Sequence, residues 1–179
     1  MIESTLLEQI IRAAIDAGDA IMEVYATDFT IDIKSDNTPL TIADTRANDI
    51  IAAVLDTTGM PYISEEGHLT PFHIRENWTR FWLVDPMDGT KEFVNRNGEF
   101  SVNIALIDNH KPIVGVIYAP VSDTLYFADE SGAWKVEHAK GIVIGNGNYA
   151  HLKRKAIKLP LQLSTPDFTV VVSRSHLNP

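Results

Sequence analysis

The fold is decided by a central stretch, residues 100–118, which reads FSVNIALIDNHKPIVGVIY. Its apolar side chains alternate with small or polar ones, which is the two-residue period of a strand that buries one face. Turn-forming residues at 108–112 separate it from a second apolar run. The stretch therefore predicts an antiparallel hairpin. Residues 125–127 and 133–136, joined through an Asp-Glu-Ser-Gly turn, predict a second hairpin.

Two helices are expected on the N-terminal side of the hairpins. Apolar residues recur at helical spacing over about residues 5–26, and Thr5 with Glu8 has the form of a capping box. A second helix is expected to start at Thr41 and to end before a Thr-Thr-Gly stop. This start places Asp44 in the first turn of the second helix.

Short strands at 62–64 and 81–84 follow the helices, and each runs directly into acidic residues. Two helices followed by a run of strands predict an α+β domain, an antiparallel sheet with packed helices. Residues 138–166 have weak periodicity and are assigned to irregular structure. Residues 168–172 predict a further buried strand.

Composition excludes several classes of protein. The chain has no cysteine, which excludes disulfides and thiolate metal sites, and its six histidines form no close pair of the kind that zinc needs. A net charge of −9 argues against binding a nucleic acid polymer through a basic surface. No apolar run approaches the roughly 20 residues that cross a bilayer, so no integral membrane segment is expected. We expect a cytoplasmic protein and leave a peripheral position at the inner membrane open.

The strongest chemical signal lies in residues 81–90, which read FWLVDPMDGT. Asp85 and Asp88 follow an apolar strand and are separated by a proline-fixed turn. Carboxylates this close repel each other when both are ionised, and a cation between them relieves the repulsion. Mg²⁺ is the natural partner because it prefers oxygen ligands and keeps several waters. Glu65, which follows another strand, could supply a third carboxylate. The alternative is that Asp-Pro-x-Asp-Gly is only a turn.

Two other acidic motifs fit less well. A calcium loop of the EF-hand kind needs acidic ligands at alternate positions, and Pro86 and Phe93 break that pattern. Haloacid-dehalogenase phosphatases have Asp-x-Asp-Gly-Thr after a strand, with the first Asp as a covalent nucleophile. Here the two aspartates are three positions apart rather than two, so a covalent route is only the second enzymatic hypothesis.

Three motifs in order resemble the inositol monophosphatase superfamily of lithium-sensitive phosphatases. They are Thr41-Ile-Ala-Asp44, Ser64-Glu65-Glu66 and Asp85-Pro-Met-Asp88-Gly-Thr90. Within this superfamily, residues 89–93, 97–100 and 173–176 resemble the 3′(2′),5′-bisphosphate nucleotidases of the CysQ type. The resemblance runs from the first helix to His176.

The resemblance implies the N-terminal part of a layered α-β-α-β-α sugar-phosphatase fold, with the C-terminal α/β domain largely missing. We expect an N-terminal α+β metal-binding phosphatase domain over residues 1–165 and the start of the C-terminal domain over residues 166–179. The Trp-Asp-x-x-Ala motif that supplies a further metal-binding aspartate in the family is absent from this sequence. The 179-residue chain is therefore expected to lack one metal ligand, to bind metal weakly and to have little activity.

The resemblance also implies a role for each matching residue. Glu65, Asp85 and Asp88 would bind Mg²⁺ through their side chains and Met87 through its backbone carbonyl. Asp44 and Thr90 would be catalytic, together orienting and deprotonating the metal-bound water. The residues expected to contact substrate are Glu65, Asp88, Gly89, Thr90, Ser173 and His176, with Arg174 beside them. The alternatives are that Thr90 and Asp44 merely start helices and that a lone histidine is incidental.

The activity implied is magnesium-dependent hydrolysis of the 3′-phosphate of 3′-phosphoadenosine 5′-phosphate by metal-activated water, giving AMP and phosphate. The partner would be a small phosphorylated nucleotide. An inositol monophosphatase or sugar-bisphosphate phosphatase, or an inactive metal-binding fragment, is the alternative. The sequence does not indicate an oligomeric state.

Overall fold

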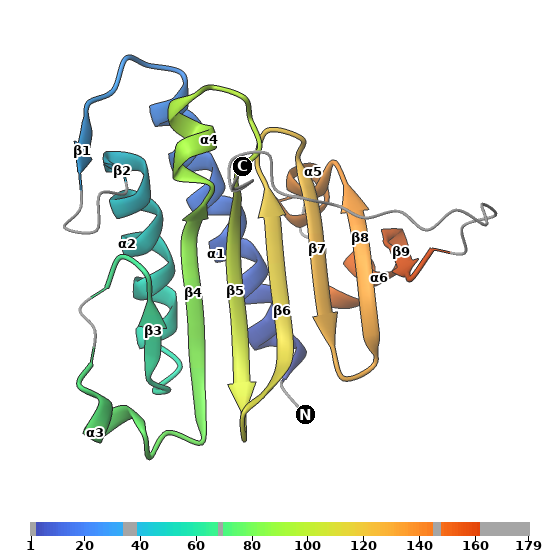
Figure 1. The fold of residues 1–179 in the computed structure, drawn as a ribbon. Coiled ribbons are helices and arrows are strands. Elements are labelled where there is room, and N and C mark those ends of the chain that lie inside the picture. The colour runs from blue at the N-terminus through green and yellow to red at the C-terminus, as the bar shows by residue number, and fades with distance from the viewer. Residues whose placement is uncertain (1–2, 34–38, 68–69, 145–147, 162–179) are drawn as a thin grey trace, which may run out of the picture.

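The computed structural model describes residues 3–33, 39–67, 70–144 and 148–161. Figure 1 shows one broad sheet seen from its open face, with the two long helices behind it. This arrangement confirms the predicted α+β class, an antiparallel sheet with packed helices.

Within the described residues the sheet has seven strands in the order β3-β4-β5-β6-β7-β8-β9. Strands β3 and β4 are parallel, and every other neighbouring pair is antiparallel. The strands of this sheet are β3 (Tyr62–Ser64), β4 (Arg80–Asp88), β5 (Ser101–Asp108), β6 (Lys111–Ala119), β7 (Thr124–Asp129), β8 (Gly132–Glu137) and β9 (Ile157–Leu159). A separate small hairpin is formed by β1 (Ile31–Ile33) and β2 (Pro39–Thr41).

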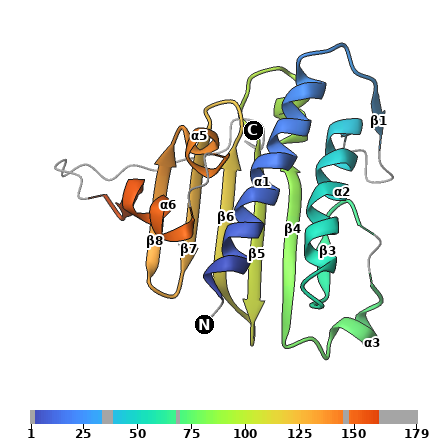
Figure 2. The ribbon, with the colours of Figure 1, turned by 180° about the vertical axis from the view of Figure 1, so that it is seen from behind.

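Two long helices cover one face of the sheet, as Figure 2 shows from behind. They are α1 (Ser4–Tyr25), which packs against β5 and β6, and α2 (Ile42–Asp56), which packs against β4. In the part of the chain that the structure describes, four shorter helices lie at the edges and ends of the sheet: α3 (Phe72–Arg75), α4 (Thr90–Val94), α5 (Ala139–Ile144) and α6 (Tyr149–Lys155). The core lies between the long helices and the sheet because the apolar stripe of each helix meets the buried face of the strands.

Strand alternation leaves the other face of the sheet open. In β5, Val102 and Leu106 point into the core and are fully buried. On neighbouring strands, Leu83, Ile117 and Tyr126 are 46%, 45% and 37% exposed. The site described below lies at one end of this open face.

Most of the predicted elements are confirmed. The hairpins, the strand at 62–64 and both long helices lie where the periodicity placed them. Thr41 and Asp44 form a capping box at the start of α2, with the Thr41 amide donating to Asp44 Oδ2 at 2.8 Å. The capping box predicted at Thr5 is wrong, since α1 begins one residue earlier, after Glu3, and has no side-chain cap.

The assignment of residues 138–166 to irregular structure is wrong over its described part. Asn148 caps α6 by accepting from the His151 amide at 2.9 Å, and β9 then pairs with β8. Lys153 holds α6 to the β7–β8 hairpin, with its ammonium 3.1 Å from Asp129 and 3.9 Å from the ring centroid of Trp134. These contacts are tertiary, so local periodicity does not reveal them. The strand predicted at 168–172 and the domain boundary at residue 165 lie outside the described residues.

Candidate active site

Two parallel strands bring the first pair of carboxylates together. Ser64 at the end of β3 is in register with Val84 of β4, and the Glu65 amide donates to the Val84 carbonyl at 3.1 Å. Glu65 and Asp85 are therefore the next residues after the last β3–β4 pair, Ser64 and Val84, and they lie at the same edge of the sheet. The predicted carboxylates at strand ends become neighbours because the strands run in the same direction.

A β-bulge brings in the second aspartate. Asp85 pairs with Asn103 of β5 and Asp88 pairs with Ser101, so three steps along β4 match two steps along β5. In a regular strand, residues three apart point to opposite faces. The extra residue of a bulge reverses that alternation. Asp85 and Asp88 consequently face the same side of the sheet, away from α1 and α2. The turn predicted at Asp85-Pro-Met-Asp88 is thus a continuation of β4.

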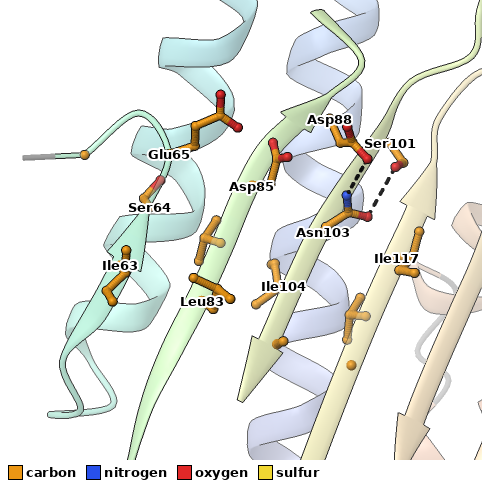
Figure 3. A pocket seen from close by; sticks show the side chains of 15 residues that line it. Ile63, Ser64, Glu65, Leu83, Asp85, Asp88, Ser101, Asn103, Ile104 and Ile117 are labelled. Atoms are coloured by element: carbon orange, nitrogen blue, oxygen red, sulfur yellow. Dashed lines mark hydrogen bonds between the residues drawn. The ribbon is translucent and has the colours of Figure 1, made fainter. Parts of the chain in front are cut away.

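The three carboxylates line one pocket of about 830 Å³ on the open face. Figure 3 shows Glu65 and Asp85 rising side by side from adjacent strands, with Asp88 farther along β4. Below them the pocket is lined by apolar or small residues of four strands: Ile63, Leu83, Ala105, Gly115 and Ile117. The acidic groups therefore form one end of the hollow, together with the polar side chains of Ser64, Ser101 and Asn103, and the other end is apolar.

The carboxylates disturb one another electrostatically. Burial, then the charges of Glu65 and Asp88, raise the pKa of Asp85 to about 7. A divalent cation would relieve this repulsion, and carboxylate oxygens are the donors that Mg²⁺ prefers. The donor set therefore fits the metal in chemistry. As they stand, however, no three His, Cys, Asp or Glu side chains in the described part of the chain are already spaced to hold an ion.

Asp44 lies beneath the site and is fully buried. Its Oδ1 accepts from the Thr90 hydroxyl at 3.1 Å, while its Oδ2 accepts from the Thr41 hydroxyl at 2.8 Å. Burial raises the pKa of Asp44, and the hydrogen bonds from Thr41 and Thr90 oppose that rise. A hydrogen bond thus joins Asp44 and Thr90, which are 46 positions apart in the sequence, and we call them the Asp44–Thr90 pair.

Thr90 also connects this pair to the bulge. It is the first residue of α4, and its hydroxyl oxygen lies 3.4 Å from the Met87 carbonyl. Gly89, between them, has φ of 98°, and a Cβ there would lie 2.8 Å from the Glu99 carbonyl oxygen. Only glycine fits such a backbone. The tight turn holds Thr90 against both Asp44 and Met87.

The predicted substrate residues Ser173 and His176, and the neighbouring Arg174, lie outside the described residues. The backbone contacts to phosphate expected of Gly89 and Thr90 stay a prediction, as do the metal-binding roles of Glu65, Asp85, Met87 and Asp88 and the catalytic roles of Asp44 and Thr90. In the described part of the chain, no helix is both long and apolar enough to span a bilayer. The cytoplasmic location and the peripheral position at the inner membrane also stay predictions.

Three polar residues of the site were not singled out by the sequence. Asn103 donates to Asp88 Oδ2 at 3.3 Å and accepts from the Ser101 hydroxyl at 3.2 Å. Asn48, one turn after Asp44 in α2, accepts from the Ser64 hydroxyl at 2.6 Å and so ties α2 to the end of β3. The signal that could have identified Ser101 and Asn103 is the polar face of β5, but only with the β4–β5 register known.

The chain is similar over most of its length to proteins of known family. It is 51% identical over 175 residues to the 3′(2′),5′-bisphosphate nucleotidase CysQ of Escherichia coli strain K12, covering 96% of this chain and 64% of that protein. It is 42% identical over 177 residues to the protein of the same name from Buchnera aphidicola, covering 97% of this chain and 61% of that protein. The chain thus spans somewhat under two thirds of the length of these relatives.

The fold leads to the same group. The crystal structure of CysQ from Bacteroides thetaiotaomicron, described as a bacterial member of the inositol monophosphatase family, superposes with a TM-score of 0.83. The two sequences are 42% identical, and the match covers 99% of this chain and 65% of that one. The sequence pattern of the inositol monophosphatase family matches residues 3–168. The chain therefore belongs to the inositol monophosphatase family.

Proposed function

We propose that this chain carries the metal-binding and catalytic residues of a phosphatase that removes the 3′-phosphate of 3′-phosphoadenosine 5′-phosphate, giving AMP and phosphate. The observation that carries the proposal is the bulge in β4, which turns Asp85 and Asp88 to the same side as Glu65. The substrate class follows the relatives, which are named 3′(2′),5′-bisphosphate nucleotidases and are up to 51% identical to this chain.

The acidic end of the pocket is the proposed place for Mg²⁺. Glu65, Asp85 and Asp88 would hold it through their carboxylates and Met87 through its carbonyl. When bound, the ion supplies positive charge that activates water and neutralises the phosphoryl oxygens. The chain's own residues must then orient the attacking water and take its proton.

The Asp44–Thr90 pair can perform this second task. Asp44 is fully buried, so it does not meet the water directly, whereas Thr90 is only partly buried. Thr90 donates its proton to Asp44 and keeps its oxygen lone pairs free to accept one from water. Asp44 thereby acts as the base through Thr90. The water oxygen would bond to phosphorus while its proton passes through Thr90 to Asp44. The bond from phosphorus to the 3′-oxygen breaks, and that oxygen takes a proton from solvent.

A phosphate-release assay tests the proposal. The chain is assayed alone and as a chimera joined to the C-terminal part of the E. coli relative that it does not span. The substrates are 3′-phosphoadenosine 5′-phosphate and inositol 1-phosphate, with Mg²⁺ and then with added Li⁺. We expect the chimera to prefer the nucleotide and to be inhibited by Li⁺. Equal rates on both substrates, or no effect of Li⁺, would contradict the nucleotidase assignment. A preference for inositol 1-phosphate would favour the inositol phosphatases.

A further inference from the structure

Beside the acidic residues, β5 presents two neutral polar side chains to the same pocket. Ser101 and Asn103 are two positions apart, so they lie on one face of the strand, while Val102 between them is fully buried in the core. The β4–β5 register places Asn103 opposite Asp85 and Ser101 opposite Asp88. Their place is therefore set by the same bulge that orients the two aspartates.

The hydrogen bonds among these residues run in one direction. The Ser101 hydroxyl donates to Asn103 Oδ1 at 3.2 Å, and Asn103 Nδ2 donates to Asp88 Oδ2 at 3.3 Å (Figure 3). An ionised carboxylate can only accept, so the amide must turn its nitrogen toward Asp88. The Ser101 hydroxyl then donates to the amide oxygen of Asn103, and this second hydrogen bond fixes the orientation of the amide. The chain of bonds ends on one carboxylate oxygen and leaves Asp88 Oδ1 for another partner.

The donor is well suited to a carboxylate that must also attract a cation. A lysine or arginine in its place would neutralise Asp88 and compete with a metal ion. The amide of Asn103 restricts rotation of the carboxylate without cancelling its charge. Hydrogen-bonding partners of metal ligands commonly act in this way.

We propose that Asn103, oriented by Ser101, is a positioning residue that holds the Asp88 carboxylate ready for a divalent cation. The inference rests on the proposed function, in which Asp88 is a metal ligand. Asn103 does not touch the phosphoryl group in this proposal. Its contribution is to restrict the Asp88 carboxylate to one orientation, in which Oδ1 is left for the cation.

Metal binding tests this role in the chain and in the chimera. Mn²⁺, as a paramagnetic substitute for Mg²⁺, is titrated into the wild type and the variants of both, and the free ion is measured by electron paramagnetic resonance. We expect Asn103→Leu, which keeps the shape but removes the donor, to weaken binding on the order of 10-fold. Ser101→Ala should have a smaller effect, because the amide can still donate. Asn77→Ala, an exposed asparagine near α3, is the matched control and should bind as the wild type does.

A second measurement follows the contact without metal. Nuclear magnetic resonance spectra of the metal-free chain give the side-chain amide resonances of Asn103. Relative to the wild type, these resonances should shift in the Asp88→Asn variant and stay unchanged in the Asn77→Ala variant. Thermal unfolding of Asn103→Leu should occur close to that of the wild type, which separates positioning from folding.

The outcomes distinguish the two proposals. If neither the wild-type chain nor the wild-type chimera binds Mn²⁺, the metal site of the proposed function is wrong and the positioning role is lost with it. If Asp88→Asn abolishes binding but Asn103→Leu binds as tightly as the wild type, only the positioning role is overturned.

Discussion

At the scale of single residues, the site separates into carboxylates that line the pocket and one aspartate that is fully buried. Asp88 is exposed at the pocket, whereas Asp44 is completely covered and reaches the site only through Thr90. The sequence could place Asp44 in a helical first turn, because the capping box is a local pattern. It could not show that Thr90, 46 positions later, donates to that carboxylate.

The Thr90 hydroxyl should be needed for turnover more than for binding. In the chimera, Thr90→Val removes the link between water and Asp44, and we expect kcat to fall by roughly 10²–10⁴-fold with a small change in KM. Thr90→Ser keeps the hydroxyl and should retain most of the activity. Thr57→Val, the same change at an exposed helix end, is the control. A Thr90→Val enzyme with near-normal kcat would show that Thr90 only starts α4.

The pKa of Asp85 predicts how metal binding depends on pH. Since this pKa is raised to about 7, the metal-free group keeps a proton over much of the range below 7, and a cation must displace it. Affinity for Mg²⁺ should therefore increase as pH rises toward 7 and level off above it. Calorimetry at pH 6.5 in buffers of different ionisation enthalpy should detect proton release, which Asp85→Asn should abolish.

The same shift has a consequence for the metal-free fold. Asp85 holds its proton more tightly in the folded chain than in the unfolded one, whose pKa is near 3.8. Its contribution to the free energy of unfolding must therefore fall as pH rises from about 4 to about 7. Unfolding of Asp85→Asn should lack this part of the pH dependence. Mg²⁺ should restore stability to the wild type at pH 7 and not to the variant.

At the scale of elements, the periodicity of the sequence predicted the helices and strands that depend on neighbouring residues. It did not predict the features that depend on pairing between distant strands. The apolar stripe of α1 and the alternation of buried and less buried residues in β5 can each be recognised within one continuous segment, and both were predicted correctly. The bulge in β4 depends on its register with β5, and β9 depends on pairing with β8. Such long-range choices leave no clear trace in a local stretch of sequence.

The contact between α1 and β6 depends on a glycine. A Cβ at Gly18 would lie 2.5 Å from Tyr118 Cε1, and the Tyr118 ring is buried with its hydroxyl bonded to Asp123 at 3.0 Å. The ring cannot easily move, so Gly18→Ala should lower the free energy of unfolding by about 1–3 kcal/mol.

The matched change for this contact is Gly141→Ala in α5, where a Cβ meets nothing within 4 Å. It should be neutral or stabilise the fold by about 0.4–1 kcal/mol, because alanine restricts the unfolded chain. Urea unfolding of both variants measures the difference. Equal stabilities would mean that α1 can move away from β6 at little cost.

At the scale of the whole molecule, the sheet has two unlike faces. One face is covered by α1 and α2 (Figures 1 and 2) and forms the core. The other face carries the pocket and half-exposed apolar side chains. The predicted α+β class is correct because it follows from the order of elements. Which face would carry the acidic residues could not be predicted, since that depends on the bulge.

The two faces should respond differently to the same substitution. Leu106 is fully buried in the core, so Leu106→Ala should lower the free energy of unfolding by about 2–5 kcal/mol. Leu83 is 46% exposed on the open face, so Leu83→Ala should lower the free energy of unfolding by about 1 kcal/mol or less. Chemical denaturation of the two variants checks the asymmetry. A Leu83→Ala variant as unstable as Leu106→Ala would indicate that the open face is covered in solution.

The bulge in β4 makes the spacing of the two aspartates as important as their chemistry. Deleting Pro86 or Met87 would change neither the net charge nor the number of acidic groups, yet regular pairing would then have to resume one residue sooner. Either Asp88 would stay opposite Ser101 in an unbulged strand, or the whole acidic end would slip along β5. In the first case the two aspartates, then two positions apart, would still face the same side. In the second case they would lose their partners Asn103 and Ser101. A one-residue insertion would need a wider bulge or would turn one aspartate to the other face, so insertions within residues 85–88 should be tolerated less well than deletions.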